Sequence, residues 1–262
     1  MSGDINILHL SDLHIGGATA SSESIRDNIE SALRRNFENT IDVIIVTGDI
    51  FDIISDKDGK NNILCEDKKL EIALDFFNVL SEKLKIDKKD ILFVPGNHDI
   101  YLDSDKGDDI NPWKLYDRFL IQFYENEQDI LEMYSLDTHM VIKKDYQRNI
   151  LFLGFNSNFF EKLDGGDKKY KIKLDIKQFD KLTSLLNDAS FPYNNYYKIA
   201  FFHHPFYVSD EDKDYVDGLI VNAENVQNQL AEYNIKLVLH GHKHLIKMRL
   251  ERQKGAQFYT IA

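Results

Sequence analysis

The sequence predicts an α/β fold with largely buried strands. Short apolar runs rich in β-branched residues alternate along the chain with longer stretches of helical periodicity. This alternation is typical of α/β proteins, whose strands are covered by helices. At 262 residues with 43% hydrophobic and 12% aromatic content, the chain can bury one substantial core. We therefore expect a single domain over residues 1–262.

The expected strands are the short apolar runs. In order, they are INILHL (5–10), VIIV (43–46), ILFV (91–94), ILFLGF (150–155), KIAFF (198–202) and KLVL (236–239). Apolar residues at helical spacing between these runs predict helices over 66–85, 112–126, 175–188 and 222–233. Pro112 is expected at the first position of its helix, where the missing amide costs no hydrogen bond.

Charge and composition narrow the class of protein. The formal net charge of −12 argues against a basic groove for nucleic acid, because such binding needs clustered lysine and arginine. The single cysteine, Cys65, excludes a disulfide framework within the chain. The sequence has no charged-then-apolar leader and no apolar run of membrane-spanning length. We therefore expect a cytoplasmic protein with no membrane partner.

Polar blocks follow five of the apolar runs directly. They are Ser11-Asp12-Leu13-His14, Thr47-Gly48-Asp49, Pro95-Gly96-Asn97-His98-Asp99, His203-His204-Pro205 and His240-Gly241-His242-Lys243-His244. Ligands of open α/β sheets bind outside the carboxyl ends of the strands, so these blocks are expected to converge on one site. All the histidines except His139 lie in or beside them.

The residue types of these blocks suit divalent metal ions. In extended chain, a spacing of two places Asp12 with His14, and His242 with His244, on the same face. Glycines 48 and 96 would let the backbone approach a ligand closely and turn at the strand end. The carboxylate, amide and imidazole groups exceed what one ion needs, which predicts two ions that share a bridging carboxylate.

In their order, the motifs D-x-H, G-D, G-N-H-D, H-x-P and G-H-x-H resemble the signature of the calcineurin-like metallophosphoesterase superfamily, and they span residues 12–244. The resemblance implies a four-layer α-β-β-α sandwich of two mixed β-sheets flanked by helices, with a binuclear metal site at the strand C-terminal ends. One metal would take Asp12, His14 and His244. The other would take Asn97, His203 and His242, with Asp49 bridging both.

His98 resembles the catalytic histidine of the superfamily, which hydrogen-bonds the phosphoryl group or protonates the leaving oxygen. Asp99 follows it and is expected to orient its imidazole. His204 is expected either to contact substrate or to be a hydrogen-bonded neighbour of the site, while His9 and His240 are expected to pack beside it. Asp52 is expected to be a loop or helix-cap residue. The site should hold Mn, Fe, Zn or Co.

Two ions a few ångströms apart can hold a bridging hydroxide for in-line attack on a phosphoester. The expected function is a phosphodiesterase acting on a small or nucleotide-type phosphodiester. A nuclease on DNA or RNA, a phosphomonoesterase and a non-catalytic scaffold are the alternatives. Nucleic acid is disfavoured by the charge, and the acidic loop 206–220 beside His203 would also repel a polyanion.

Two further expectations concern chain organisation. Residues 100 to about 148 lie between the third and fourth blocks and are expected to form an inserted helical segment. Its aromatic residues belong either to the core or to a wall of the pocket. The final stretch FYTIA reads as an interior strand at the end of the chain. Either the fold closes unusually early, or the chain is the N-terminal catalytic domain of a longer protein with a C-terminal regulatory domain; the second alternative is slightly favoured.

Overall fold

A computed structural model of the chain describes the following residues: 4–16, 24–25, 27–29, 31, 41–52, 64–101, 111–125, 130, 132–135, 137–162, 168–187, 193–207, 218–244, 247–253 and 255–262. Most of the acidic loop expected at 206–220 lies outside these residues, as does part of the segment 100–148.

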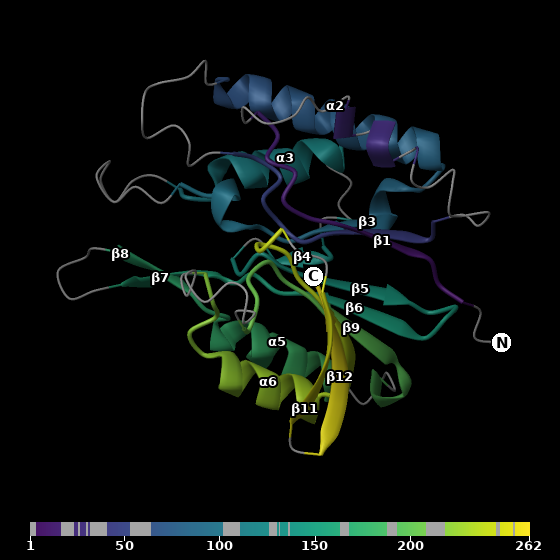
Figure 1. The fold of residues 1–262 in the computed structure, drawn as a ribbon, viewed down its shortest axis with the longest axis vertical. Helices are drawn as coiled ribbons and strands as arrows, with labels where there is room; N and C mark the ends of the chain where they lie inside the picture. Colours follow the sequence, from purple (N-terminus) through teal and green to yellow (C-terminus); the bar gives the residue numbers. More distant parts are fainter. Residues whose placement is uncertain are drawn as a thin grey trace.

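The described elements form four layers (Figure 1). Helices α2 (Glu66–Leu84) and α3 (Lys114–Phe123) cover one sheet, and helices α5 (Ile176–Leu186) and α6 (Ala223–Glu232) cover the other. The two sheets pack against each other between these helical layers. The predicted α/β sandwich of β-sheets flanked by helices is therefore confirmed.

Three of the polar blocks follow the strands of the smaller sheet. It has the strand order β1 (Ile7–Leu10), β2 (Val43–Val46), β3 (Ile91–Phe93), and all of its pairs are parallel. Because the strands are parallel, their carboxyl ends, and the blocks that follow them, meet at one edge.

The larger sheet is mixed. Its strand order is β11 (Met248–Gln253), β12 (Ala256–Ile261), β10 (Ile235–Leu239), β9 (Tyr197–Phe201), β6 (Ile150–Gly154), β5 (Met140–Asp145) and β4 (Tyr134–Ser135). The central pairs β12–β10, β10–β9 and β9–β6 are parallel, whereas the outer pairs are antiparallel. The expected interior position of FYTIA is confirmed, because β12 lies between β10 and β11.

Alternation along the central strands explains why their sequences are apolar throughout. In β9, Ile199 and Phe201 face the core shared with the smaller sheet, and Ala200 faces the core beneath α5 and α6. In β6, Phe152 belongs to the first core and Leu153 to the second. Successive side chains of a strand point to opposite faces, so a sheet buried on both sides needs apolar residues at every position.

The predicted helices are present with small differences at their ends. Helix α3 begins at Lys114, two residues beyond Pro112, so the predicted N1 position of that proline is wrong. The side-chain oxygen of Asn111 accepts from the backbone N–H of Trp113 at 3.0 Å, and the turn that this contact forms directly precedes the helix. Short 3-10 helices are η2 (Lys88–Asp90), η3 (Asn97–Asp99) and η5 (Tyr193–Asn195).

The segment 100–148 is helical only in part. Its described residues contain α3, whose apolar face is buried, and also β4 and β5, which extend the larger sheet. Phe119 of α3 packs edge-on against Phe93 of β3 with ring centroids 5.1 Å apart. The core assignment of these aromatic residues is therefore confirmed for most of α3, although Trp113 at its start is only half-buried.

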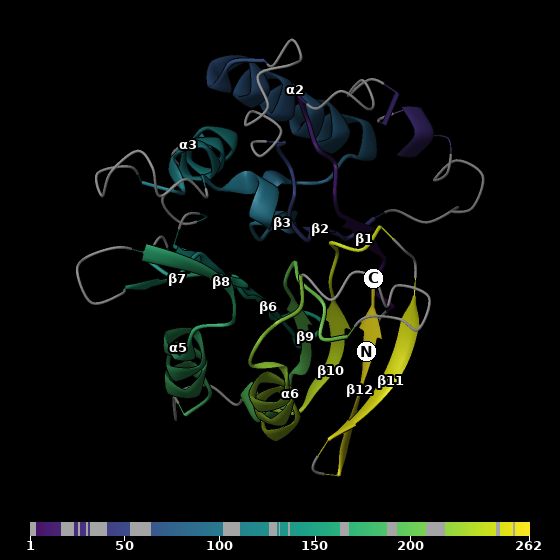
Figure 2. The ribbon, with the colours of Figure 1, turned by 60° about the vertical axis from the view of Figure 1, so that its left-hand side comes forward.

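An antiparallel ribbon that the sequence did not predict stands apart from both sheets. It consists of β7 (Asn158–Lys162) and β8 (Lys168–Ile172), and it lies between α3 and α5 (Figure 2). Among the described helices, none combines the length and the apolar character that a bilayer span requires.

Candidate metal centre

Backbone pairing between loops brings the polar blocks together. The N–H of Asp12 donates to the carbonyl of Gly48 at 3.1 Å, and the N–H of His14 donates to the carbonyl of Asp49 at 2.9 Å. The loops after β9 and β10 are joined in the same way, because the N–H of Gly241 donates to the carbonyl of His203 at 2.9 Å. The predicted convergence at the carboxyl ends of the strands is thus present.

The backbone at these positions is not extended. Left-handed φ angles occur at Asp12 (57°), His14 (46°), Asp49 (53°), His242 (76°) and His244 (50°). The argument that a spacing of two in extended chain places their side chains on one face is therefore wrong. Left-handed φ is uncommon for residues with a Cβ and clusters at functional sites, where the surrounding structure enforces it.

Two glycines allow the second and third loops to touch. A Cβ on Gly48, whose φ is +88°, would lie 2.5 Å from the backbone nitrogen of Gly96. A Cβ on Gly96 would lie 2.1 Å from Oδ1 of Asp49. The expected close approach is therefore made between the loops themselves, and it places Asp49 beside Asn97 and His98.

A first group that could hold a metal ion consists of Asp12, His14 and His244. One ligand atom from each lies within 4.8 Å of the others. Nε2 of His244 is 3.3 Å from Oδ1 of Asp12. The backbone N–H of His242 donates to Oδ2 of Asp12 at 3.0 Å and fixes the orientation of the carboxylate.

A second group surrounds His203, which is fully buried. Its Nε2 lies 3.2 Å from Oδ1 of Asn97, 3.1 Å from Nδ1 of His242 and 3.2 Å from Oδ2 of Asp49. Its Nδ1 lies 2.7 Å from the carbonyl of Thr47. A carbonyl only accepts, so Nδ1 carries the proton and Nε2 points at the other three ligand atoms.

The electrostatics of this second group favour a bound cation. Burial opposes protonation, yet the charge and hydrogen bond of Asp49 raise the pKa of His203 to about 9. Burial and the neighbouring His203 lower the pKa of His242 to about 3. The ligand atoms of His203, His242, Asn97 and Asp49 converge, and this mixed donor set fits a metal ion.

Asp49 connects the two groups through one atom. Its Oδ2 is 3.2 Å from Nε2 of His203 and 4.0 Å from Nε2 of His14. Its Oδ1 accepts from the backbone N–H of His98 at 2.8 Å. Although burial opposes it, the charge of His203 holds the pKa of Asp49 well below its usual range. The geometry leaves Oδ2 free to face both groups.

His98 lies at the edge of the first group. Its ring stands edge-on to that of His14, with centroids 4.6 Å apart. Its Nδ1 is 3.1 Å from Oδ1 of Asp52, and the backbone carbonyl of Asp52 accepts from the buried Nζ of Lys69 at 2.7 Å. Asp52 is therefore the carboxylate that orients this imidazole.

The prediction that Asp99 orients the imidazole of His98 is wrong. Asp99 is fully buried, and its two carboxylate oxygens accept from the backbone N–H groups of Phe51 and Gly96, each at 2.8 Å. Burial raises the pKa of this carboxyl to about 7. Its role is to join the loop after β2 to the turn before η3. Sequence reasoning missed Asp52, whose only signal was its position in the same loop as Asp49.

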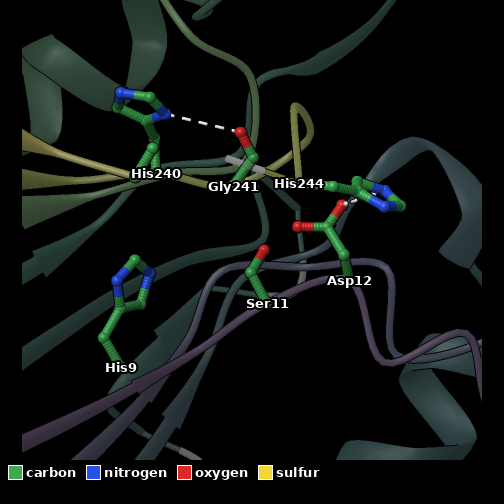
Figure 3. A pocket seen from close by; sticks show the side chains of 7 residues that line it. His9, Ser11, Asp12, His240, Gly241 and His244 are labelled. Atoms are coloured by element: carbon green, nitrogen blue, oxygen red, sulfur yellow. Dashed lines mark hydrogen bonds and ion pairs between the residues drawn. The ribbon is translucent and has the colours of Figure 1, made fainter. Parts of the chain in front are cut away.

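Of the remaining histidines near the site, His204 adjoins the second group, because one of its ring nitrogens lies within 4.8 Å of ligand atoms of His203 and His242. Nδ1 of His204 is 2.8 Å from Oγ of Ser157, and its ring is fully buried, so of the two roles expected for it the hydrogen-bonded one is confirmed. His9 and His240 line a cavity of about 290 Å³ that also reaches Asp12 and His244 (Figure 3). Burial lowers the pKa of both His9 and His240 to about 4.

Comparison with known proteins identifies the family. The sequence pattern of the calcineurin-like phosphoesterase family matches residues 5–245, so the chain belongs to this family. The family relates the chain to metal-dependent phosphoester hydrolysis and implies a binuclear metal centre, which agrees with the two groups described above. No curated protein matches the chain in sequence.

Solved structures share the fold at low sequence identity. TT1561 of Thermus thermophilus is 16% identical with a TM-score of 0.53, over 97% of this chain and 87% of its own. The purple acid phosphatase PPD1 from yellow lupin (Lupinus luteus) is 12% identical with a TM-score of 0.55. This second match covers 100% of this chain but only 44% of the lupin protein. At these identities the likeness shows the fold alone.

Proposed function

We propose that this protein is a metal-dependent phosphodiesterase that acts on a small or nucleotide-type phosphodiester. The observation that carries the proposal is the position of Asp49. Its Oδ2 faces both ligand groups, while the imidazole of His98, oriented by Asp52, lies beside them.

The proposed ligands divide as the two groups do. Asp12, His14 and His244 hold one ion, and Asn97, His203 and His242 hold the other. Asp49 is shared by both. When bound, two divalent ions activate water and neutralise charge on the phosphoryl oxygens. The mixed oxygen and nitrogen donors suit Mn, Fe, Zn or Co.

The chain's own proton donor is His98. Asp52 accepts from Nδ1, which leaves Nε2 to hydrogen-bond the phosphoryl group or to donate a proton to the leaving oxygen. The contact with Asp52 holds the ring in a fixed orientation. His98 is partly exposed, with 29% of its side chain accessible, and substrate can therefore reach it.

The charge of the chain supports a small substrate over a long polyanion. The net charge of −12 argues against the clustered basic side chains that a polyanion would need.

The test compares hydrolysis of bis(p-nitrophenyl) phosphate and p-nitrophenyl phosphate. Metal-stripped protein is reloaded with Mn, Zn, Fe or Mg, and Asp49→Asn serves as the blank. We expect turnover of the diester at least about 10-fold above that of the monoester, which corresponds to about 1.4 kcal/mol in activation free energy. The reverse preference would indicate a phosphomonoesterase. Absence of turnover with both ions bound would contradict hydrolysis of these esters altogether.

A further inference from the structure

A second cavity of about 470 Å³ lies between the start of α3, the start of α5 and the β7–β8 ribbon. None of the proposed metal ligands lines it. Its volume falls within the range of sites for small organic ligands. Its lining combines aromatic rings with buried amide and hydroxyl groups.

Trp113 forms the aromatic wall together with Phe160. The indole stacks on the ring of His139 with centroids 4.2 Å apart and an interplanar angle of 29°. Nε2 of His139 is in turn 2.9 Å from Oδ1 of Asp117, which fixes the ring beneath the indole. Phe160 stands edge-on to Trp113 at 6.0 Å. The indole is thus held rigidly before any ligand arrives.

The lining also includes a buried polar atom without a partner among the described residues. Thr138 is 8% exposed, and its Oγ1 is buried with no hydrogen-bond partner. Asn156 is 5% exposed, and its Oδ1 accepts from the backbone N–H of Asn158 at 2.9 Å. Buried polar groups are nearly always paired, so the unpaired hydroxyl of Thr138 at this cavity indicates a ligand that can hydrogen-bond it.

A direct contact links this cavity to the metal centre. Nδ2 of Asn158, which lines the cavity, donates to the carbonyl of Pro95 at 3.0 Å, and Tyr170 donates to Oδ1 of Asn158 at 2.8 Å. Pro95 precedes the proposed ligand Asn97 by two residues, so the side chain of Asn158 joins the lining of the cavity to the loop that carries this ligand.

We infer that this cavity holds the planar base of a nucleotide whose phosphodiester lies at the metal centre. The inference rests on the proposed phosphodiesterase function and names its substrate class. Base rings stack on aromatic side chains, and their donor and acceptor edges can hydrogen-bond the unpaired hydroxyl of Thr138. A ligand that satisfied this hydroxyl would be distinguished from apolar rings of the same size.

Trp113 is the single tryptophan of the chain, so its fluorescence reports on the cavity alone. Metal-free protein is titrated with adenosine, guanosine, cytidine and uridine, which carry no phosphate. We expect saturable quenching by at least one of them. Phe160→Ala should weaken that binding about 10-fold, as loss of one stacking contact does, whereas Tyr146→Ala, an exposed aromatic residue outside the cavity, should not. No saturable change with any nucleoside would overturn the inference.

The same variants are then compared in hydrolysis. The substrates are a p-nitrophenyl ester of a nucleoside 5′-phosphate and bis(p-nitrophenyl) phosphate, both as diesters. In Phe160→Ala, the ratio of kcat/KM for the nucleoside ester to that for the simple ester should fall about 10-fold. An unchanged ratio would overturn the substrate role of the cavity. If the simple ester is hydrolysed but no nucleoside binds, only the base site is overturned. If neither ester is hydrolysed, the proposed function is overturned as well.

Discussion

Oδ1 of Asp52 lies 3.1 Å from Nδ1 of His98, and this contact sets which ring nitrogen faces the metal centre. Because a carboxylate only accepts, Nδ1 carries a proton and Nε2 is directed away from Asp52. Lys69 holds the backbone of Asp52 from the other side through its carbonyl. The proton donor of the proposed reaction is therefore positioned by a residue of a different loop.

Asp52→Asn should lower kcat on bis(p-nitrophenyl) phosphate roughly 10- to 100-fold while both metals remain bound. The amide oxygen can still accept from Nδ1, but a neutral oxygen holds that N–H less strongly than a carboxylate does. The loss should be larger for an alkyl leaving group, which needs its proton, than for p-nitrophenol. An equal loss with both leaving groups would argue against this positioning role. Asp180→Asn, an exposed change of the same type, is the control.

His98→Ala should keep two metals and lose about 10²- to 10⁴-fold in kcat, the usual scale of general acid–base catalysis. Metal content by elemental analysis and steady-state kinetics measure the two quantities separately. If the variant instead lost its metals, His98 would be a ligand and its catalytic assignment would fail.

Asp49→Asn should lose both metals and activity together, because a neutral amide cannot balance the charge of two ions. Added Mn should raise the Tm of the wild type in a concentration-dependent way and leave the variant's Tm unchanged. Retention of two metals by the variant would refute a bridging role for Oδ2. Asp180→Asn again controls for the loss of one carboxylate.

Asp99→Asn should destabilise the fold rather than act on catalysis directly. An amide offers one acceptor atom where the carboxylate offers two, so a buried N–H of Phe51 or Gly96 is left unpaired. We expect the free energy of unfolding to fall by about 1–3 kcal/mol in urea titrations with chelator present. A change below about 0.5 kcal/mol, the usual range for surface substitutions, would mean that these bonds contribute little.

The surface pair of Asp137 and Lys181 predicts a pH effect of definite sign. Hydrogen bonds from Lys181 and Ser135 lower the pKa of Asp137 to about 2. A carboxyl whose pKa is lower in the folded state stabilises the fold above its ordinary pKa, and this contribution is lost as the pH falls toward 2. Lys181→Met should cost less than about 1 kcal/mol at pH 6, because the pair is exposed. The difference from wild type should shrink at acidic pH, and a constant difference would contradict the assignment.

Residue patterns predicted the α/β class and one site at the strand ends, because apolar runs were followed by polar blocks and parallel strands end at a common edge. The resemblance to the metallophosphoesterase family then assigned the individual ligands, such as Asp12, Asp49 and His203. Their expected backbone conformation was nevertheless wrong, since the left-handed φ angles depend on pairing between loops that are distant in sequence.

The tertiary structure was needed to identify the residue that orients the imidazole of His98. Asp99 is adjacent to His98 in sequence, yet it bonds two backbone amides, whereas Asp52 reaches the imidazole from another loop. The cavity beside Trp113 likewise joins residues from four separate segments, and no local pattern predicts such a neighbourhood. Spacing along the chain specifies local periodicity and strand ends, but contacts between loops follow from how whole elements pack.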